Sequence, residues 1–161
     1  MVYRYKASIP GNKIFMREYE VKGSSSLYNF HLYLQNDLGF APDQIVLFRA
    51  LDKSGKVKRE YGLFNLGDGS MDSITLDKVY KEALPVLEYV YDMFKERSLH
   101  LEFLSTEEEL ARRAYPRLVA ERGKNPDQFS DNYDDFEHMI EPADTDLIIS
   151  DSEFVKEGEE S

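Results

Sequence analysis

The chain has 161 residues, enough for one compact domain with an extension but too few for two full-sized domains with separate cores. It contains no cysteine, which excludes disulfides, thiolate metal sites, iron–sulfur clusters and a cysteine nucleophile. The net charge of −11 is unevenly distributed: residues 126–161 hold 13 acidic side chains and one basic one, a balance of −12, whereas residues 1–125 hold 18 acidic and 19 basic side chains. Nucleic-acid backbones are bound by strongly basic surfaces, so we expect no direct nucleic-acid binding.

The N-terminal segment lacks the apolar core of a signal peptide, and no apolar run approaches the roughly 20 residues of a membrane helix. Together with the absence of cysteine, this predicts a cytoplasmic protein without a membrane partner.

The first predicted elements form a hairpin. Residues 2–9 alternate between apolar and polar side chains, which predicts a half-buried strand. The turn sequence Pro10-Gly11-Asn12 follows, and residues 14–21 predict the returning strand. The side chains expected on the buried faces are Tyr3, Tyr5, Ala7, Ile9, Phe15, Tyr19 and Val21.

A helix is predicted after the hairpin. Ser24, Ser25 and Ser26 offer N-cap oxygens, and Gly39 suits the left-handed residue that ends a helix. The residues at helical spacing between them are Leu27, Phe30, His31, Leu34 and Leu38.

Strands dominate the rest of the predicted body. Residues 44–51 contain four contiguous apolar side chains, which predicts a central strand buried on both faces. Residues 57–64 are a weaker strand after the turn at 52–55, and residues 73–81 predict a short helix that Pro85 ends. Two more strands are predicted around residues 87–91 and 99–103, and a helical stretch begins beyond Thr106 and is interrupted at Pro116.

The predicted order is β-β-α-β-(β)-α-β-β, an α+β fold with a mostly antiparallel sheet and one main helix on a face. The opening hairpin and helix suit a ubiquitin-like grasp. We expect a single domain over residues 1–125 and an acidic, largely irregular C-terminal tail over residues 126–161.

The helix carries the closest resemblance to a known family. Ser26-Leu27, Phe30-His31, Leu34 and Gly39-Phe40 have the spacing of a motif in the plasmid pRiA4b ORF-3-like family, small bacterial proteins associated with mobile elements and without an established activity. Further segments that resemble it are Arg17, Glu20-Val21, Ile45, Phe48, residues 76–79, Tyr91-Asp92 and Tyr115-Pro116-Arg117, so the resemblance covers about residues 2–126.

The departures from that family concern polar positions. Gln44 replaces a strand histidine, Met93-Phe94-Lys95 replaces Phe-Gly-Asp, and Asn125-Pro126-Asp127 replaces a Cys-Pro-Pro-Glu-Asp segment. The chain therefore resembles a divergent member whose fold carries over, whereas a site built on those positions does not.

Three histidines are present, His31, His100 and His138. His31 and His100 with Asp92, or with Glu102 in its place, would be the weak candidates for a metal site, since two histidines and a carboxylate leave a coordination position open. The alternative is that His31, on the apolar helix face, is a hydrogen-bonded core residue and that His100 lies on the polar side of its strand. We predict no cofactor.

No sequence motif supports serine catalysis, nucleotide binding or nucleic-acid binding. The serines do not lie in a Gly-x-Ser-x-Gly elbow, and Gly67-Asp68-Gly69 does not belong to a phosphate-binding loop. Tyr3, Tyr5, Tyr89 and Tyr91 share strand faces with aliphatic residues, which favours core packing over a base-stacking platform. The basic residues Lys53, Lys56, Lys58 and Arg59 favour a solvated hairpin tip over a nucleic-acid patch.

These observations favour a non-enzymatic protein-interaction or regulatory module, which binds a protein partner or associates with itself through the tail. Leu147, Ile148 and Ile149 are the predicted contact residues, because three consecutive aliphatics in an acidic segment favour docking as an added edge strand. The host would be the chain's own sheet, a second copy or another protein. A mobile-element-associated, nucleic-acid-linked role and a His/Asp metal-dependent enzyme are the alternatives.

Overall fold

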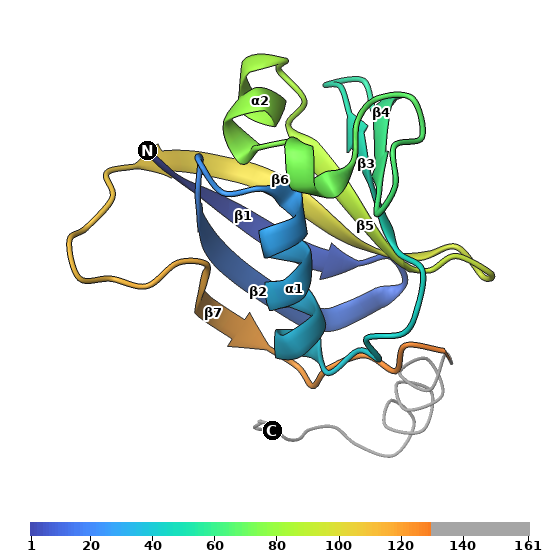
Figure 1. Ribbon diagram of the computed structural model, residues 1–161. Coiled ribbons are helices and arrows are strands. Elements are labelled where there is room, and N and C mark those ends of the chain that lie inside the picture. The colour runs from blue at the N-terminus through green and yellow to red at the C-terminus, as the bar shows by residue number, and fades with distance from the viewer. Residues whose placement is uncertain (130–161) are drawn as a thin grey trace.

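The computed structural model describes residues 1–129, in which seven strands form one sheet with antiparallel pairing throughout (Figure 1). Their order across the sheet is β4-β3-β5-β6-β1-β2-β7. The strands are β1 (Val2–Ile9), β2 (Asn12–Lys22), β3 (Leu47–Leu51), β4 (Val57–Gly62), β5 (Val86–Asp92), β6 (Arg97–Glu107) and β7 (Arg117–Arg122). The predicted α+β class with a mostly antiparallel sheet is confirmed.

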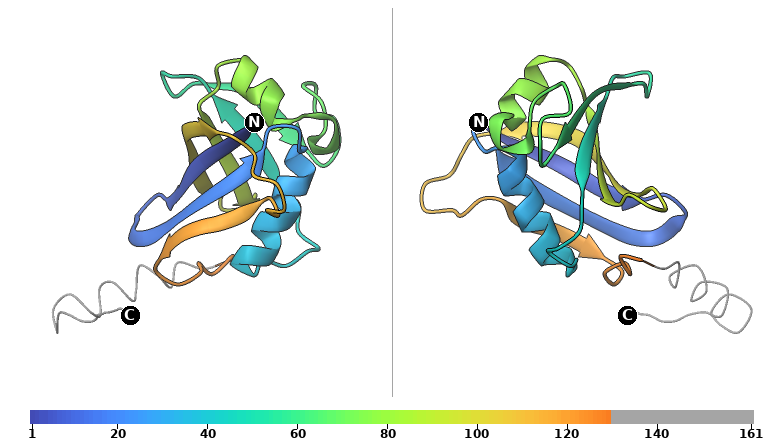
Figure 2. Two further views of the ribbon diagram at one scale, coloured as in Figure 1. Left: turned by 90° about the vertical axis from the view of Figure 1, so that its left-hand side faces the viewer. Right: turned by 45° about the vertical axis from the view of Figure 1, so that its right-hand side comes forward.

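Helix α1 (Leu27–Leu38) lies across one face of this sheet, which we call the inner face (Figure 2). All seven side chains expected on the buried face of the opening hairpin are buried there. Tyr89 and Tyr91 from β5 join Tyr3 and Tyr5 in the same core cluster, beside Leu99 and Leu101 from β6. The tyrosines therefore pack in the core, as the alternation predicted, and do not form an exposed stacking platform.

The ends of α1 also follow the sequence. The Ser26 side chain accepts a hydrogen bond from the backbone N–H of Asn29 at 3.0 Å, which satisfies one of the free donors of the first turn. Gly39 ends the helix with a φ of 72°, in the left-handed region that favours glycine. Local signals were enough to define this helix.

The predicted helix over residues 73–81 is divided into two pieces. A 3₁₀ turn, η1 (Met71–Ser73), precedes α2 (Leu76–Lys81), and the N-cap of α2 is Thr75, whose side chain accepts from the N–H of Lys78. Leu76 and Val79 are buried, so this side of α2 covers the margin of the core.

The prediction for β3 was wrong in its start and in its place. The strand begins at Leu47 rather than residue 44, and Ile45 is exposed. β3 is second from the edge of the sheet, and β6 holds the centre. A contiguous apolar run fits a buried strand, but here it continues from the strand into the loop before it.

The helical stretch predicted beyond Thr106 is not formed. β6 continues to Glu107, which pairs with Val2, and residues 108–116 contain no helix. The unpredicted strand β7 follows and pairs with β2. The ubiquitin-like comparison stays a prediction; the second neighbour of β1 is β6, which runs antiparallel to it.

The packed body continues past residue 125. Pro126 and Gln128 are buried, and the Gln128 side chain accepts from the N–H of Ala41 at 2.8 Å and donates to the carbonyl of Tyr91 at 3.2 Å. The irregular segment after β7 is therefore attached to the loop after α1 and to the end of β5. Within residues 1–129 no helix is long and apolar enough to cross a membrane.

Candidate functional site

His31 lies on the buried side of α1, against the inner face of the sheet. Its Nδ1 atom and the hydroxyl of Tyr89 are 2.7 Å apart and share a hydrogen bond, and Tyr28 lies beside the ring. Burial lowers the pKa of His31 below its usual value, because the charged imidazolium loses hydration there. This histidine thus has the geometry of a hydrogen-bonded core residue.

His100 lies on the opposite face of the sheet, which we call the outer face. It alternates with the buried Leu99 and Leu101 along β6, and its neighbours in register are Ser8 and Glu88. The sheet thus separates His100 from His31, and the structure does not bring the two predicted metal ligands together.

Asp92, the third weak candidate, orders the turn between β5 and β6. Its carboxylate accepts from the N–H groups of Phe94 and Lys95 at 3.1 and 3.2 Å and lies 3.9 Å from the Arg97 guanidinium. In the described part of the chain, no three histidine, cysteine, aspartate or glutamate side chains are grouped to hold a metal ion.

The outer face carries pairs of opposite charge across the strands. The clearest group surrounds Glu20, which is buried: Arg4 donates to it at 2.7 Å and Arg117 at 2.9 Å. Burial alone would raise the pKa of this carboxyl, but the hydrogen bond from Arg4 and the charge of Arg117 outweigh burial and hold the pKa below its usual value. These contacts connect β1, β2 and β7, so sequence analysis could not identify them from local spacing.

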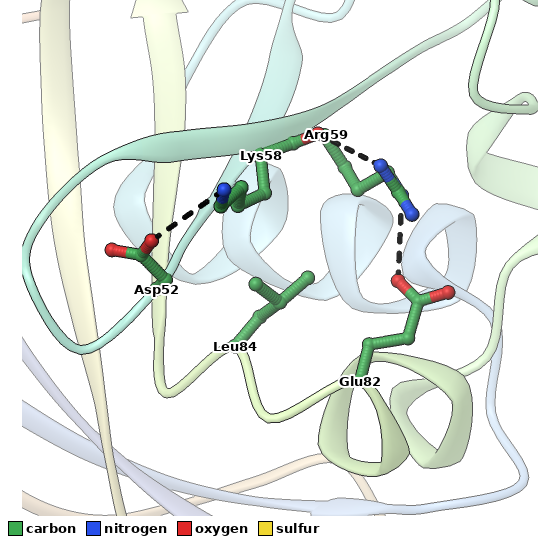
Figure 3. Close-up of a pocket in the computed structure, with 5 residues that line it drawn as sticks. All are labelled: Asp52, Lys58, Arg59, Glu82 and Leu84. Carbon is green, nitrogen blue, oxygen red and sulfur yellow. Dashed lines mark hydrogen bonds and ion pairs between the residues drawn. The ribbon is translucent and has the colours of Figure 1, made fainter.

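A surface pocket of about 430 Å³ lies between the β3–β4 hairpin and the end of α2 (Figure 3). Lys58 is 3.9 Å from Asp52 and Arg59 is 3.5 Å from Glu82, and Leu84 stands between these two ion pairs. The pairs neutralise two of the four cations at the predicted basic hairpin tip. The pocket therefore presents a balanced set of charges rather than a phosphate-binding field.

Tyr61 lies near this pocket and is fully buried. Burial, together with the charge of Glu82, raises its pKa to about 12, and its hydroxyl has no hydrogen-bond partner within residues 1–129. A phenol with this pKa keeps its proton at neutral pH, so it is not a general base.

Large exposed apolar side chains gather at one end of the sheet. Ile45 is 72% exposed, Phe64 81%, Met93 38% and Phe94 93%. Leu47 pairs with both Gly62 and Val90, so the start of β3, the end of β4 and the β5–β6 turn lie at the same end (Figure 1). We call these four side chains the apolar rim.

Sequence analysis did not select the apolar rim. The available signal was a set of large apolar residues next to turn sequences, but that signal does not say which turns meet. The three predicted contact residues, Leu147, Ile148 and Ile149, lie outside the described residues.

The fold and these sites define an α+β protein with a seven-stranded antiparallel sheet, one face covered by a helix and the other carrying paired charges. The family model of the plasmid pRiA4b ORF-3-like proteins matches residues 4–153. The chain belongs to this family, and the match continues well beyond the predicted limit at residue 126.

The structural comparison agrees on the fold. The crystal structure of a protein of unknown function from Methanosarcina mazei Go1 matches with a TM-score of 0.71 and 17% sequence identity, covering 88% of this chain and 80% of that chain. A search of curated proteins found no match.

Proposed function

We propose that this protein is a non-enzymatic interaction module that binds another protein through the apolar rim. The observation that carries the proposal is the exposure of Phe64 and Phe94 at the same end of the sheet, with Ile45 and Met93. Large exposed apolar groups tend to mark binding surfaces, and aromatic side chains supply a large share of the energy in protein interfaces.

The geometry of the rim supports this function. The side chains stand on the loop before β3, the segment after β4 and the β5–β6 turn, and Asp92 holds that last turn through two backbone hydrogen bonds. The sheet thus presents the rim on a fixed base, which lowers the entropy that ordering would cost on binding.

Capture of a partner from cell extract tests the proposal. The full chain, the double variant Phe64→Ser/Phe94→Ser and the control Leu110→Ser would be compared at equal concentrations. Leu110 is also an exposed apolar loop residue, but it follows the far end of β6. We expect a stoichiometric protein partner with the wild type and with Leu110→Ser, and its loss with the rim variant. Capture that is unchanged by the rim variant would contradict the proposal.

A nucleic-acid-linked role is the alternative. Two observations favour it: the family is associated with mobile elements, and the tip of the β3–β4 hairpin carries basic residues. A mobility-shift titration distinguishes it, because binding to phosphates weakens steeply as salt increases. We expect no shift for the chain at physiological salt. A shift that disappears with added salt and with Lys56→Ala/Lys58→Ala would favour the alternative.

A further inference from the structure

Strand β7 forms one edge of the sheet. β2 pairs with one side of it, and no strand within residues 1–129 pairs with the other. An edge strand offers unpaired backbone N–H and C=O groups to a further strand. The hydroxyl of Tyr33, from α1, already has a hydrogen bond to the backbone of Leu118. The part of β7 left for another strand is therefore residues 119–122, except the carbonyl of Arg122, which already accepts from Arg17.

The core is incompletely covered next to this edge. Tyr33 and Leu118 pack against the core cluster but remain only partly buried. A strand added beside β7 on this side would place alternate side chains near these two residues. Aliphatic side chains at those positions would extend the core.

The segment around β7 is basic. Residues 111–124 contain five basic side chains and one acidic one, and Arg112, Arg113, Arg122 and Lys124 are exposed. The C-terminal segment that follows has the opposite charge, and Asp144, Asp146, Asp151 and Glu153 flank its aliphatic triplet. The edge and the triplet are therefore complementary in charge as well as in apolar character.

The connection is long enough to return to the edge. Gln128 attaches the chain to Ala41 and Tyr91, and residues 130–146 then separate Phe129 from Leu147. Seventeen residues can span up to about 60 Å. This reach includes both edges of a seven-stranded sheet, whose strands are about 4.8 Å apart, so the tether itself does not select an edge.

We propose that Leu147, Ile148 and Ile149 add to the free edge of β7 in the same molecule as an eighth strand. Two of these residues are β-branched and suit a strand. The family match to residues 4–153 includes the triplet and is consistent with a shared structural role. The added strand covers Tyr33 and Leu118, and its flanking carboxylates face the basic segment.

Amide hydrogen exchange on the full chain tests the contact. We expect the amides of residues 147–149 to exchange at least about tenfold more slowly than an unstructured chain, to the same extent at all protein concentrations. The variant Ile148→Ser/Ile149→Ser removes this protection and speeds exchange in residues 119–122. The control Phe154→Ser, in the same segment, leaves both unchanged. Full exchange of the triplet in the wild type overturns the proposal, and protection that rises with concentration assigns the strand to a second copy instead.

A pair of introduced cysteines tests which edge of the sheet the triplet docks against. Because the chain has no cysteine, Glu121→Cys/Ser150→Cys introduces the only two thiols, one in β7 and one directly after the triplet. The matched pair Lys58→Cys/Ser150→Cys places the first thiol on β4, at the opposite edge of the sheet. We expect the intramolecular disulfide of the β7 pair to form at least about tenfold faster, since it requires Cα atoms within roughly 7 Å. Equal rates would mean that the segment is not docked at β7.

Discussion

Two arginines on opposite faces of the sheet differ in burial and in the partners that hold them. Arg17 is 2% exposed on the inner face, and its guanidinium donates to the carbonyls of Arg122 and Gly123 and to Oδ1 of Asn125 at 2.8–2.9 Å. Arg49, on the outer face, lies 3.1 Å from Glu60 beside solvent. A buried charge needs fixed partners, whereas an exposed ion pair contributes at most about 1 kcal/mol.

This difference shows how the C-terminal part of the body is held. The partners of Arg17 lie more than a hundred residues along the chain, and Phe15 stacks on its guanidinium with 4.4 Å between the charge and the ring centre. Arg17 thus connects β2 to the end of β7 and the segment after it. Arg49 and Glu60 instead lie between β3 and β4, which backbone pairing already holds along their length.

The largest expected effect follows from removing the inner charge. Arg17→Met should lower the free energy of unfolding by about 3 kcal/mol, since several charge-assisted hydrogen bonds are lost. The matched change Arg49→Met should cost less than about 1 kcal/mol. Urea denaturation of both variants measures the difference. Equal losses of unfolding free energy in the two variants would mean that burial does not make the contacts of Arg17 more stabilising than those of Arg49.

The same comparison applies to the histidines. His31→Ala should destabilise the protein by roughly 1–3 kcal/mol, because the buried hydroxyl of Tyr89 loses its partner. His100→Ala, on the outer face, should change stability by less than about 0.5 kcal/mol. Thermal melts and elemental analysis of the purified proteins check both variants. Unchanged stability with loss of a bound divalent ion from His31→Ala would instead favour the metal site.

A truncation pair examines the segment that Arg17 and Gln128 hold. A chain that ends at residue 129 should melt cooperatively, and one that ends at residue 125 should still fold but be less stable by about 1–2 kcal/mol. The expected loss comes from the two hydrogen bonds of Gln128. Calorimetry of the two truncated chains measures the difference in stability. If the shorter chain is as stable as the longer one, the contacts of Gln128 contribute nothing.

The smallest expected effect is a dependence of folding stability on pH. The folded protein lowers the pKa of His31, so below its usual value of 6.5 the unfolded state binds more protons than the folded state. Stability should therefore fall as the pH decreases from about 7 to about 5. His31→Gln should reduce this dependence of stability on pH, as denaturation midpoints at several pH values would show. An identical slope in His31→Gln would exclude His31 as its source.

Much of the fold could be predicted because its signals are local. Alternation placed Tyr3, Tyr5 and Tyr19 in the core, and Ser26 and Gly39 defined the ends of α1. The same patterns placed His31 on a buried helix face and His100 on a polar strand face. The apolar rim could not be predicted, because its members come from three separate turns that only the strand pairing brings to one end.

The sequence by itself determined the hairpin, the main helix and the faces that they bury, since each depends on side-chain period and on caps within a few residues. Only the tertiary structure decided that β7 is a strand and that β3 begins at Leu47. β7 is a six-residue segment with arginine at both ends, and it is a strand because β2 pairs with it. Arg17, more than a hundred residues earlier, then fixes the end of β7, and no local pattern contains a contact between residues so far apart in the chain.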